Sequence, residues 1–178
     1  MKILLHICCA NCAIYPVKTL RERGVEVTGY FFNHNIHPYQ EFRRRLDTVQ
    51  HYAEEVGLPL VMNDSYGLDE FLANVAADPA SRCPYCYRSR LEEAARFAAE
   101  NGFDAFSSSL LYSRYQQHEV IRTIGEELGE RFGVKFLYED FRRGWQEGIV
   151  ASKALGLYRQ QYCGCIYSER DRYQPKGL

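Results

Sequence analysis

The segment KILLHICCANC, residues 2–12, decides the fold of this chain. Residues 2–7 form an almost unbroken apolar run with the length of a short buried strand. A stretch with helical character follows from Ala13 to Arg23 and ends at Gly24, a residue type that commonly terminates helices. A strand that leads directly into a helix is the first half of a strand–helix–strand unit, so the segment predicts an α/β fold.

The same alternation of strands and helices continues to residue 155. The apolar pattern predicts further strands at 26–32, 58–63, 104–111 and 134–139. Helices are expected between them, over about 42–56, 68–76, 83–101, 120–132 and 145–155. Short connections between such units imply a single α/β domain, residues 1–178, with a mainly parallel five-stranded sheet and helices on both faces. We expect the tail, residues 156–178, to be irregular and to close an active site at the carboxyl ends of the strands.

The composition restricts the class of protein. The chain has 178 residues and a net charge of −1 at pH 7, so any contact with nucleic acid must rest on a local basic patch. No window of about 18 apolar residues exists, and the N-terminus lacks the pattern of a signal peptide. We therefore expect a cytoplasmic protein without a membrane partner. In that compartment, clustered cysteines indicate metal binding or redox catalysis rather than structural disulfides.

The seven cysteines fall into three clusters, CCANC at 8–12, CPYC at 83–86 and CGC at 163–165. A C-x-x-C pair offers two ligands, and two further thiolates would complete a four-cysteine site for zinc or for an iron–sulfur cluster. Adjacent cysteines such as Cys8 and Cys9 chelate a single zinc poorly, because successive side chains point in different directions. Seven thiols also exceed the four that one cluster needs. The surplus indicates a second metal or a redox-active dithiol, for which the flexible CGC segment is suited.

Other segments narrow the chemistry. The connection after the first strand, residues 6–12, contains no glycine, so it cannot cradle the phosphates of NAD or ATP as glycine-rich loops do. The basic run at 43–45 is either a solvated helix face or a contact with phosphates. The loop at 33–39, which carries histidines and an aromatic residue, either packs locally or stacks on an unpaired base.

Five segments resemble the QueH-type epoxyqueuosine reductases, and the resemblance covers nearly the whole chain. They are LHICCANC at 5–12, FFNHNIHP at 31–38, CPYC at 83–86 with Arg88 and Leu91, residues 107–115 with Gln117 and His118, and LYRQQYCGCIYS at 157–168. The last segment is the most specific of them. Asn11 is a departure, because the family usually has proline there; the change alters the rigidity of the loop but removes no sulfur.

The resemblance implies a Rossmann-like α/β fold and a reaction. Such enzymes reduce the epoxide of epoxyqueuosine, at the wobble position of certain tRNAs, to the cyclopentene of queuosine. The partners are therefore tRNA and an electron donor that the sequence does not identify. The resemblance also implies a [4Fe–4S] cluster and, beside it, a second mononuclear iron.

The resemblance further divides the cysteines between these sites, so that all seven are candidate metal ligands. It implies that the ligands of the cluster are Cys8, Cys9, Cys83 and Cys86. The expected catalytic cysteines are Cys163, Cys165 and Cys12. The first two of these would be a redox-active pair that forms a disulfide bond, or ligands of the second metal, and the third would belong to that second site.

Further residues are candidates for substrate contact or proton transfer. We expect the substrate to contact His34, Tyr112, Arg114, Arg159 and Tyr162. The departing oxygen needs a proton donor, and the candidates are Tyr112, Tyr162, Tyr167, His6 and Asp140. Two other functions use the same cysteines: a non-catalytic, zinc-stabilised module that binds tRNA, and a general thiol oxidoreductase that acts through C-x-x-C.

Overall fold

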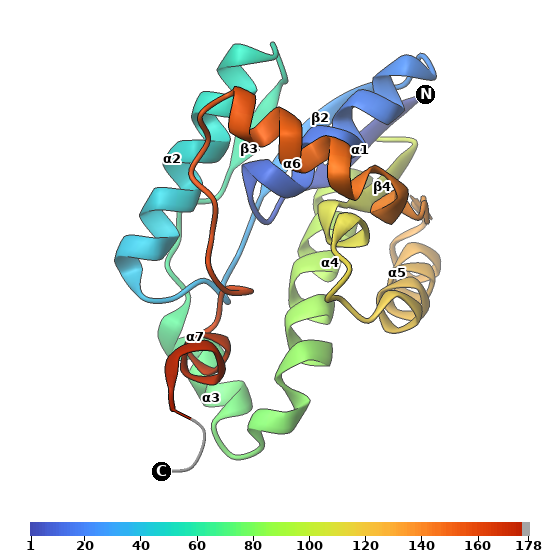
Figure 1. Cartoon of the computed structure of the whole chain (residues 1–178). Helices are drawn as coiled ribbons and strands as arrows, with labels where there is room; N and C mark the ends of the chain where they lie inside the picture. Colours follow the sequence, from blue (N-terminus) through green and yellow to red (C-terminus); the bar gives the residue numbers. More distant parts are fainter. Residues whose placement is uncertain (176–178) are drawn as a thin grey trace.

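A parallel sheet forms the centre of the structure (Figure 1). The computed structural model describes residues 1–175, and within them the strands are ordered β3-β2-β1-β4-β5. Their bounds are β1 Lys2–His6, β2 Glu26–Phe31, β3 Leu60–Met62, β4 Ala105–Ser108 and β5 Lys135–Phe136. Each pair of neighbouring strands runs parallel. The predicted single α/β domain with a five-stranded parallel sheet is therefore confirmed.

Helices cover both faces of this sheet, as expected. In the described residues the α-helices are α1 Ala10–Glu22, α2 Tyr39–Glu55, α3 Leu68–Val75, α4 Arg82–Glu100, α5 His118–Phe132, α6 Trp145–Ala154 and α7 Ile166–Tyr173. The 3₁₀ helices are η1 Pro79–Ser81, η2 Ser109–Tyr112 and η3 Phe141–Gly144. Helix α1 packs against α6 and α2 over one face, whereas α4 and α5 pack together over the other. None of the helices within residues 1–175 has the length and apolar character needed to cross a membrane.

The strand order reverses beside β1, and this reversal places the site. β1 pairs with β2 on one side and with β4 on the other, so that His6 lies between Tyr30 and Ser108. In open parallel sheets such a reversal opens a crevice at the carboxyl ends of the strands. The first cysteines follow β1 at that end of the sheet.

The buried residues around β1 hold this strand, and therefore the cysteines that follow it, in a fixed position. Ile3, Leu4 and Leu5 of β1 are fully buried, as is Phe106 of β4. Complete burial of such side chains stabilises a fold by roughly 1.5–3 kcal/mol each. Gly29 of β2 allows this close packing, because a Cβ atom at this position would meet the side chain of the residue that follows β1 at 2.8 Å.

All five strands are shorter than the apolar pattern predicts, β1 and β2 by one residue and the other three by more. The expected strand at 104–111 ends at Ser108, whose Oγ accepts a hydrogen bond from the Leu110 N–H at 3.1 Å and starts η2. The two edge strands, β3 and β5, are also shorter than expected. Short edge strands leave little open edge for pairing with other chains.

The tail is not irregular throughout, which corrects the expectation from the sequence. Helix α7 begins after its N-cap, Cys165, whose Sγ accepts a hydrogen bond from the Ser168 N–H at 3.4 Å. None of the α7 residues is buried, so no apolar stripe reveals this helix in the sequence. Before α7 the tail runs along α2 and reaches the region of α3 and α4. Residues 176–178 of the expected tail lie outside the described residues.

Candidate metal centre

Cys8, Cys9 and Cys12 lie together at the carboxyl end of β1. Cys9 is the N-cap of α1 and Cys12 lies in its first turn, because the helix begins at Ala10 rather than at the expected Ala13. The Cys9 and Cys12 sulfurs are 2.9 Å apart, and the Cys8 and Cys9 sulfurs are 3.8 Å apart. All three sulfurs lie within 4.8 Å of one another, which is compact enough to hold one metal ion. We call these residues the N-terminal thiol group.

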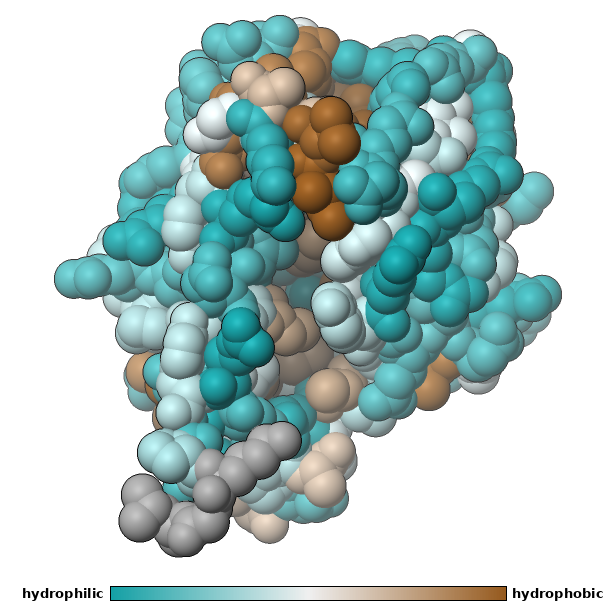
Figure 2. Space-filling model, in the orientation of Figure 1, coloured by the Kyte–Doolittle hydropathy of each residue, from teal (hydrophilic) through white to brown (hydrophobic). Residues whose placement is uncertain are grey.

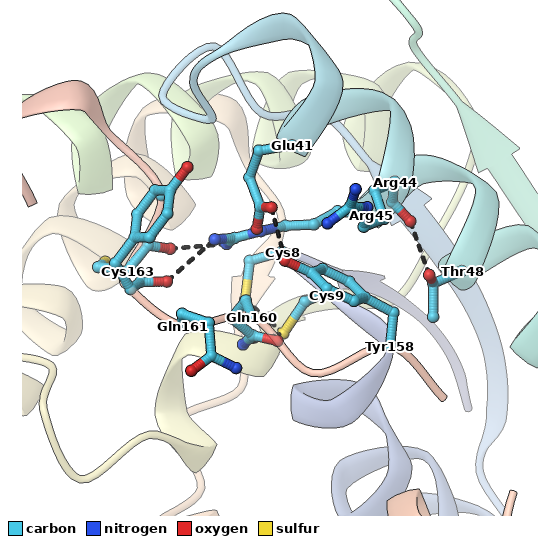
Figure 3. Close-up of polar contacts among 12 residues, drawn as sticks. Cys8, Cys9, Glu41, Arg44, Arg45, Thr48, Tyr158, Gln160, Gln161 and Cys163 are labelled. Carbon is cyan, nitrogen blue, oxygen red and sulfur yellow. Dashed lines mark hydrogen bonds and ion pairs between the residues drawn. The ribbon is translucent and has the colours of Figure 1, made fainter. Parts of the chain in front are cut away.

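Polar side chains from distant segments contact this group (Figure 3). The Gln160 Nε2 atom in the tail donates a hydrogen bond to the Cys9 Sγ at 2.9 Å. The Ser109 hydroxyl accepts a hydrogen bond from the Cys8 N–H at 3.1 Å and donates one to the Cys8 Sγ at 3.5 Å. Such donors favour negative charge on sulfur, the form that binds metals.

The three thiols share negative charge unequally. Hydrogen bonds from the Cys12 and Cys9 thiols hold the pKa of Cys8 well below its usual value. Burial raises the pKa of Cys9, and the hydrogen bond to Cys8 raises that of Cys12. A metal that binds all three thiols must therefore displace protons from Cys9 and Cys12, so its affinity should increase with pH.

Cys83, Cys86, Cys163 and Cys165 form a second set, which we call the C-terminal thiol group. Cys86 and Cys165 are buried in one apolar cluster with Phe71 of α3. Burial raises the pKa of Cys83, and negative charge on Cys163 adds to this effect. Burial also raises the pKa of Cys86 to about 12, with a further contribution from charge on Cys165. The four thiols, which come from α4 and from the tail, therefore lie within electrostatic range of one another.

Arg90 of α4 lies near both thiol groups. Only 3% of the residue is exposed, and its Nε atom donates a hydrogen bond to the Cys86 carbonyl at 2.9 Å. Its charge opposes the increase in pKa that burial imposes on Cys86, and it also favours the thiolate of Cys8. Among residues 1–175 no carboxylate forms an ion pair with Arg90. Negative charge on Cys8 and Cys86 can therefore offset this buried cation.

Arg45 of α2 holds the tail in place (Figure 3). Its Nη1 atom donates to the Cys163 carbonyl at 2.7 Å and its Nη2 atom to the Tyr162 carbonyl at 2.9 Å. Its Nε atom donates to the Glu41 carboxylate at 2.7 Å, and the Tyr158 hydroxyl donates to the same carboxylate at 2.6 Å. Only 2% of Arg45 is exposed. The third arginine of the basic run is therefore neither a solvated residue nor a phosphate contact, which corrects both interpretations of that residue.

The loop at 33–39 receives the tail rather than facing solvent. His37 is fully buried, and its N–H donates to the Gly164 carbonyl at 2.8 Å. Its Nδ1 atom accepts a hydrogen bond from the Ile166 N–H at 3.3 Å, at the start of α7. Its carbonyl accepts a hydrogen bond from the Tyr162 hydroxyl at 2.6 Å. The loop thus anchors both residues that flank Cys163 and Cys165.

Asn11 connects the first cysteine cluster with the tail. Its Nδ2 atom donates to the Tyr158 carbonyl and to the Gln160 Oε1 atom, each at 2.8 Å. Its Oδ1 atom accepts a hydrogen bond from the Ser152 hydroxyl of α6. Proline has no such side-chain groups, so the residue that departs from the family pattern makes contacts that proline could not make.

The structure brings the seven sulfurs into two groups, and the division of the cysteines that the resemblance implied stays a prediction. We expected Cys8 and Cys9 to share a cluster with the CPYC segment, and Cys12 to lie with the CGC segment. The structure places Cys12 with its neighbours in sequence, and it places the CGC segment within electrostatic range of the CPYC segment. The spacing of the cysteines did not reveal this arrangement, because it depends on how the distant tail folds back onto α3 and α4.

The expected disulfide is not formed. All seven cysteines, which all lie in the described residues, are free thiols. Cys165 is buried beside Phe71, whereas Cys163 is exposed and its Sγ accepts a hydrogen bond from the Gln116 Nε2 atom at 3.4 Å. The two side chains of the CGC segment therefore occupy different environments.

The expected substrate residues separate into two places. Tyr112 lies near the N-terminal thiol group, since charges on its cysteines help burial to raise the pKa of Tyr112 to about 12. The positive charges of Arg159 and Arg114 lower the pKa of the same hydroxyl, so both arginines lie close to it. His34 instead lines a polar pocket of about 440 Å³ whose lining contains no cysteine. Tyr162 belongs to the anchored tail, and its hydroxyl is occupied.

Two candidate proton donors do not suit that role. His6 is fully buried between Ser108 and the Phe32 carbonyl, and burial lowers its pKa to about 4. The hydrogen bond from Arg142 lowers the pKa of Asp140 to about 2. Both residues have therefore lost the transferable proton at neutral pH. The Tyr112 hydroxyl keeps its proton but donates it to the Trp145 carbonyl at 2.9 Å.

The sequence did not identify four residues that build the site, namely Glu41, Arg90, Gln116 and Gln160, and the interpretation of Arg45 was wrong. Gln160 lies inside the tail segment at 157–168, which resembles the family most specifically, but only the cysteines of that segment were interpreted. Arg45 of α2 and Arg90 of α4 each lie on the same helix face as the apolar residues of that helix, which indicates a buried position. A charged residue on an apolar helix face requires a partner, and that requirement was the available signal.

Comparisons with known proteins agree with the resemblance. A family model described as epoxyqueuosine reductase QueH matches residues 3–171. The epoxyqueuosine reductase QueH of Dehalococcoides mccartyi is 41% identical over 172 residues, which are 97% of this chain and 94% of that protein. The protein of the same name from Thermotoga maritima is 33% identical over 180 residues, covering 96% of this chain and 91% of its own.

Solved structures share the fold at low identity. The U34-tRNA thiolase NcsA from Methanococcus maripaludis, with its [4Fe-4S] cluster, matches 94% of this chain with a TM-score of 0.62 and 18% identity. This chain spans 61% of the length of that protein. A predicted subunit of tRNA methyltransferase from Methanocaldococcus jannaschii matches 85% of this chain and 74% of its own, with a TM-score of 0.54 and 11% identity. These likenesses show the α/β fold.

Proposed function

The chain belongs to the epoxyqueuosine reductase QueH family, and from this membership and the thiol geometry we propose that it reduces epoxyqueuosine in tRNA to queuosine. The epoxide accepts two electrons and two protons. Both of its carbon–oxygen bonds break, a carbon–carbon double bond forms in the cyclopentane ring, and the oxygen leaves as water. The electrons come from an external donor that remains to be identified.

One observation carries this proposal: seven free thiols gather in two groups beneath a single anchored tail at the strand-order reversal. A general thiol oxidoreductase needs two cysteines, and a structural zinc site needs four. Figure 2 shows the surface hollowed between α4 and the tail, on the face where the tail crosses the molecule. Two groups of thiols suit a reaction that needs both electron transfer and activation of an oxygen.

The donor sets fit the two metal sites that the family resemblance implies. Four thiols in the C-terminal thiol group match the ligand number of a [4Fe–4S] cluster. Three thiols within 4.8 Å in the N-terminal thiol group match a single iron with a position left for substrate. The fold is compatible with a cluster, since the NcsA thiolase carries one. When bound, these groups supply single electrons and Lewis-acid stabilisation of the departing oxygen.

The residues of the chain prepare the site for these groups. Arg90 and Arg45 are buried cations that offset the negative charge of several thiolates. Gln160 and Gln116 donate hydrogen bonds to one sulfur in each group, which favours the more negative, reduced state of a bound metal. The tail covers part of the centre and limits the access of water to it.

The substrate contacts follow from the same placement. Arg114 and Arg159 are exposed cations close to Tyr112, so they are positioned to contact phosphates of the tRNA. His34 lies in a pocket away from the cysteines, and we therefore assign it no contact with the reacting ring. Water that enters the hollow is available to carry the protons.

The experiment that tests the proposal is the iron and acid-labile sulfide content of protein purified and reconstituted without oxygen, followed by turnover on tRNA that carries epoxyqueuosine. We expect about four sulfides and about five irons per chain, as one cluster and a further iron require. Cys86→Ser should remove the sulfide, whereas Cys12→Ser should retain it and remove only the further iron. Zinc without sulfide, in a protein that still binds tRNA, would replace the reductase with a zinc-stabilised binding module.

A further inference from the structure

Tyr115 is the most exposed large apolar side chain in residues 1–175, with 84% of the residue exposed. It lies in the connection between η2 and α5. Its ring meets the Trp145 ring edge-on at 5.9 Å, and the Arg114 guanidinium lies 5.5 Å from the centre of the Trp145 ring. On another side Trp145 stacks on Tyr112 at 5.2 Å. We call these four residues the aromatic platform.

The buried part of this platform is held rigidly. Tyr112 is 3% exposed, and its hydroxyl donates to the Trp145 carbonyl at 2.9 Å. Gly148 of α6 lets the helix approach this ring, because a Cβ atom there would overlap the Tyr112 hydroxyl. The Tyr115 N–H donates to the Ser113 hydroxyl at 3.2 Å. Because the residues that support the Tyr115 ring are held rigidly, less conformational entropy is lost when this ring binds a partner.

The platform is directly connected to the thiols. Gln116 follows Tyr115, and its Nε2 atom donates to the Cys163 Sγ at 3.4 Å while its Oε1 atom accepts from the Tyr87 hydroxyl at 2.8 Å. Adjacent residues of one short segment thus face the C-terminal thiol group and the solvent. A flexible polymer with one unit at the thiols would place a neighbouring unit over the Tyr115 ring.

The charge around the ring suits a polyanion. Within residues 1–175 neither Arg114 nor Arg159 forms an ion pair with a carboxylate, whereas Arg142 and Arg143 nearby in sequence each do. The chain as a whole has a net charge of −1, so these two cations are available locally rather than as part of a basic surface. An exposed aromatic ring combined with unpaired arginines is the usual arrangement for single-stranded nucleic acid.

We propose that Tyr115, supported by Trp145, stacks on an unpaired base beside the nucleotide that reacts, and that Arg114 and Arg159 contact the neighbouring phosphates. The inference rests on the proposed function and deepens it by locating the RNA contact. It also moves the stacking role away from the loop at 33–39. That loop holds the tail, and its exposed ring, Tyr39, packs against Tyr66 at 5.3 Å.

The test is the affinity of the holoenzyme for an anticodon stem-loop RNA, measured without oxygen by fluorescence anisotropy. Tyr115→Ala should weaken binding by about 5- to 150-fold, the loss that removal of one stacked base contact causes. Tyr115→Phe should retain the affinity, because the ring remains. Tyr39→Ala is the matched control, since Tyr39 is also an exposed tyrosine (54%), and it should bind as the parent does. Arg114→Gln should reduce the slope of log affinity against log salt by about 0.7.

Other results would overturn the inference in recognisable ways. A Tyr115→Ala affinity within about twofold of the parent value, or a larger loss in Tyr39→Ala, removes the platform as the stacking site. Unchanged RNA affinity with a loss of turnover only when a protein supplies electrons, and not with dithionite, would assign the ring to an electron-donor protein. A parent that binds the RNA but reduces no epoxyqueuosine would remove the proposed reaction and leave the contact in place, so the two failures are distinguishable.

Discussion

The two thiol groups are built in different ways. The N-terminal thiol group comes from residues 8–12 alone, where one strand turns into one helix. The C-terminal thiol group joins two residues of α4 to two residues of the tail, about 80 positions later in the chain. The first group needs only the local turn after β1, whereas the second exists only while the tail is held down. Changes in the tail contacts should therefore separate the two groups.

The largest effect is expected for Arg45→Met. The change leaves the Glu41 carboxylate buried without its cation and two tail carbonyls without donors, and breaking a buried pair of this kind costs about 3–5 kcal/mol. The free energy of unfolding of the metal-free protein, from guanidinium titration under reducing conditions, measures this loss. We also expect the variant to lose sulfide on reconstitution while it still binds one metal at the N-terminal thiol group.

Arg43→Met is the control for that variant. Arg43 pairs with Asp47 on the exposed side of the same helix, where an ion pair contributes about 0–1 kcal/mol. If both variants lose similar stability and both retain sulfide, Arg45 does not hold the tail and the contrast between the two groups is lost.

Asn11→Ala should have an intermediate effect. It removes two donated hydrogen bonds to the tail and one accepted from Ser152, and an unpaired buried group costs about 1–3 kcal/mol. Hydrogen exchange at residues 157–165 should become faster, because this part of the tail loses its connection to α1. Asn101→Ala is the matched control, since the Asn101 side chain is exposed and donates only to the Phe97 carbonyl. Equal protection of the tail in both variants would show that Asn11 does not anchor it.

A smaller effect should sharpen the comparison by testing which group holds the cluster. Gln116→Leu removes a hydrogen bond to the Cys163 sulfur, and Gln160→Leu removes one to the Cys9 sulfur. A hydrogen bond of about 0.5–1.5 kcal/mol corresponds to about 20–65 mV for a one-electron couple. We expect Gln116→Leu to lower the midpoint potential of the cluster by this amount, measured by titration with EPR detection, and Gln160→Leu to leave it nearly unchanged. The reverse pattern would place the cluster in the N-terminal thiol group.

The smallest effect at neutral pH concerns His37. Burial lowers its pKa to about 4, below its usual value near 6.5, so the unfolded chain takes up its proton at a higher pH than the folded protein does. Stability from this residue is therefore fully present above pH 6.5 and decreases as pH falls toward 4. Protonation would also place a second donor against the Ile166 N–H. His37→Asn, which keeps an acceptor, should flatten the decrease between pH 6.5 and 4, and an unchanged pH profile would exclude His37 as its source.

The sequence was sufficient for the parts of the molecule that depend on near neighbours. The apolar run of β1 and the helix after it lie within a few residues of each other, so their pattern predicts their structure. The parallel arrangement of the strands follows from short connections between alternating elements.

The sequence was not sufficient where distant segments meet. The helical spacing of Arg45 indicates burial, but it does not identify the partners, Tyr162 and Cys163, which come from the distant tail. Helix α7 has no buried face, so no periodicity marks it. The position of the CGC segment could not be predicted for the same reason, because it is set by contacts with α2 and with the loop at 33–39 rather than by spacing.

The stacking of Trp145 on Tyr112 gives the protein an optical property. Trp145 is the only tryptophan in the sequence, so all indole fluorescence comes from one point beside the thiols. Iron–sulfur clusters absorb light in the region where indole emits. Binding of the cluster should therefore quench the fluorescence of Trp145 progressively. The assembly of the site can then be followed in real time without any label.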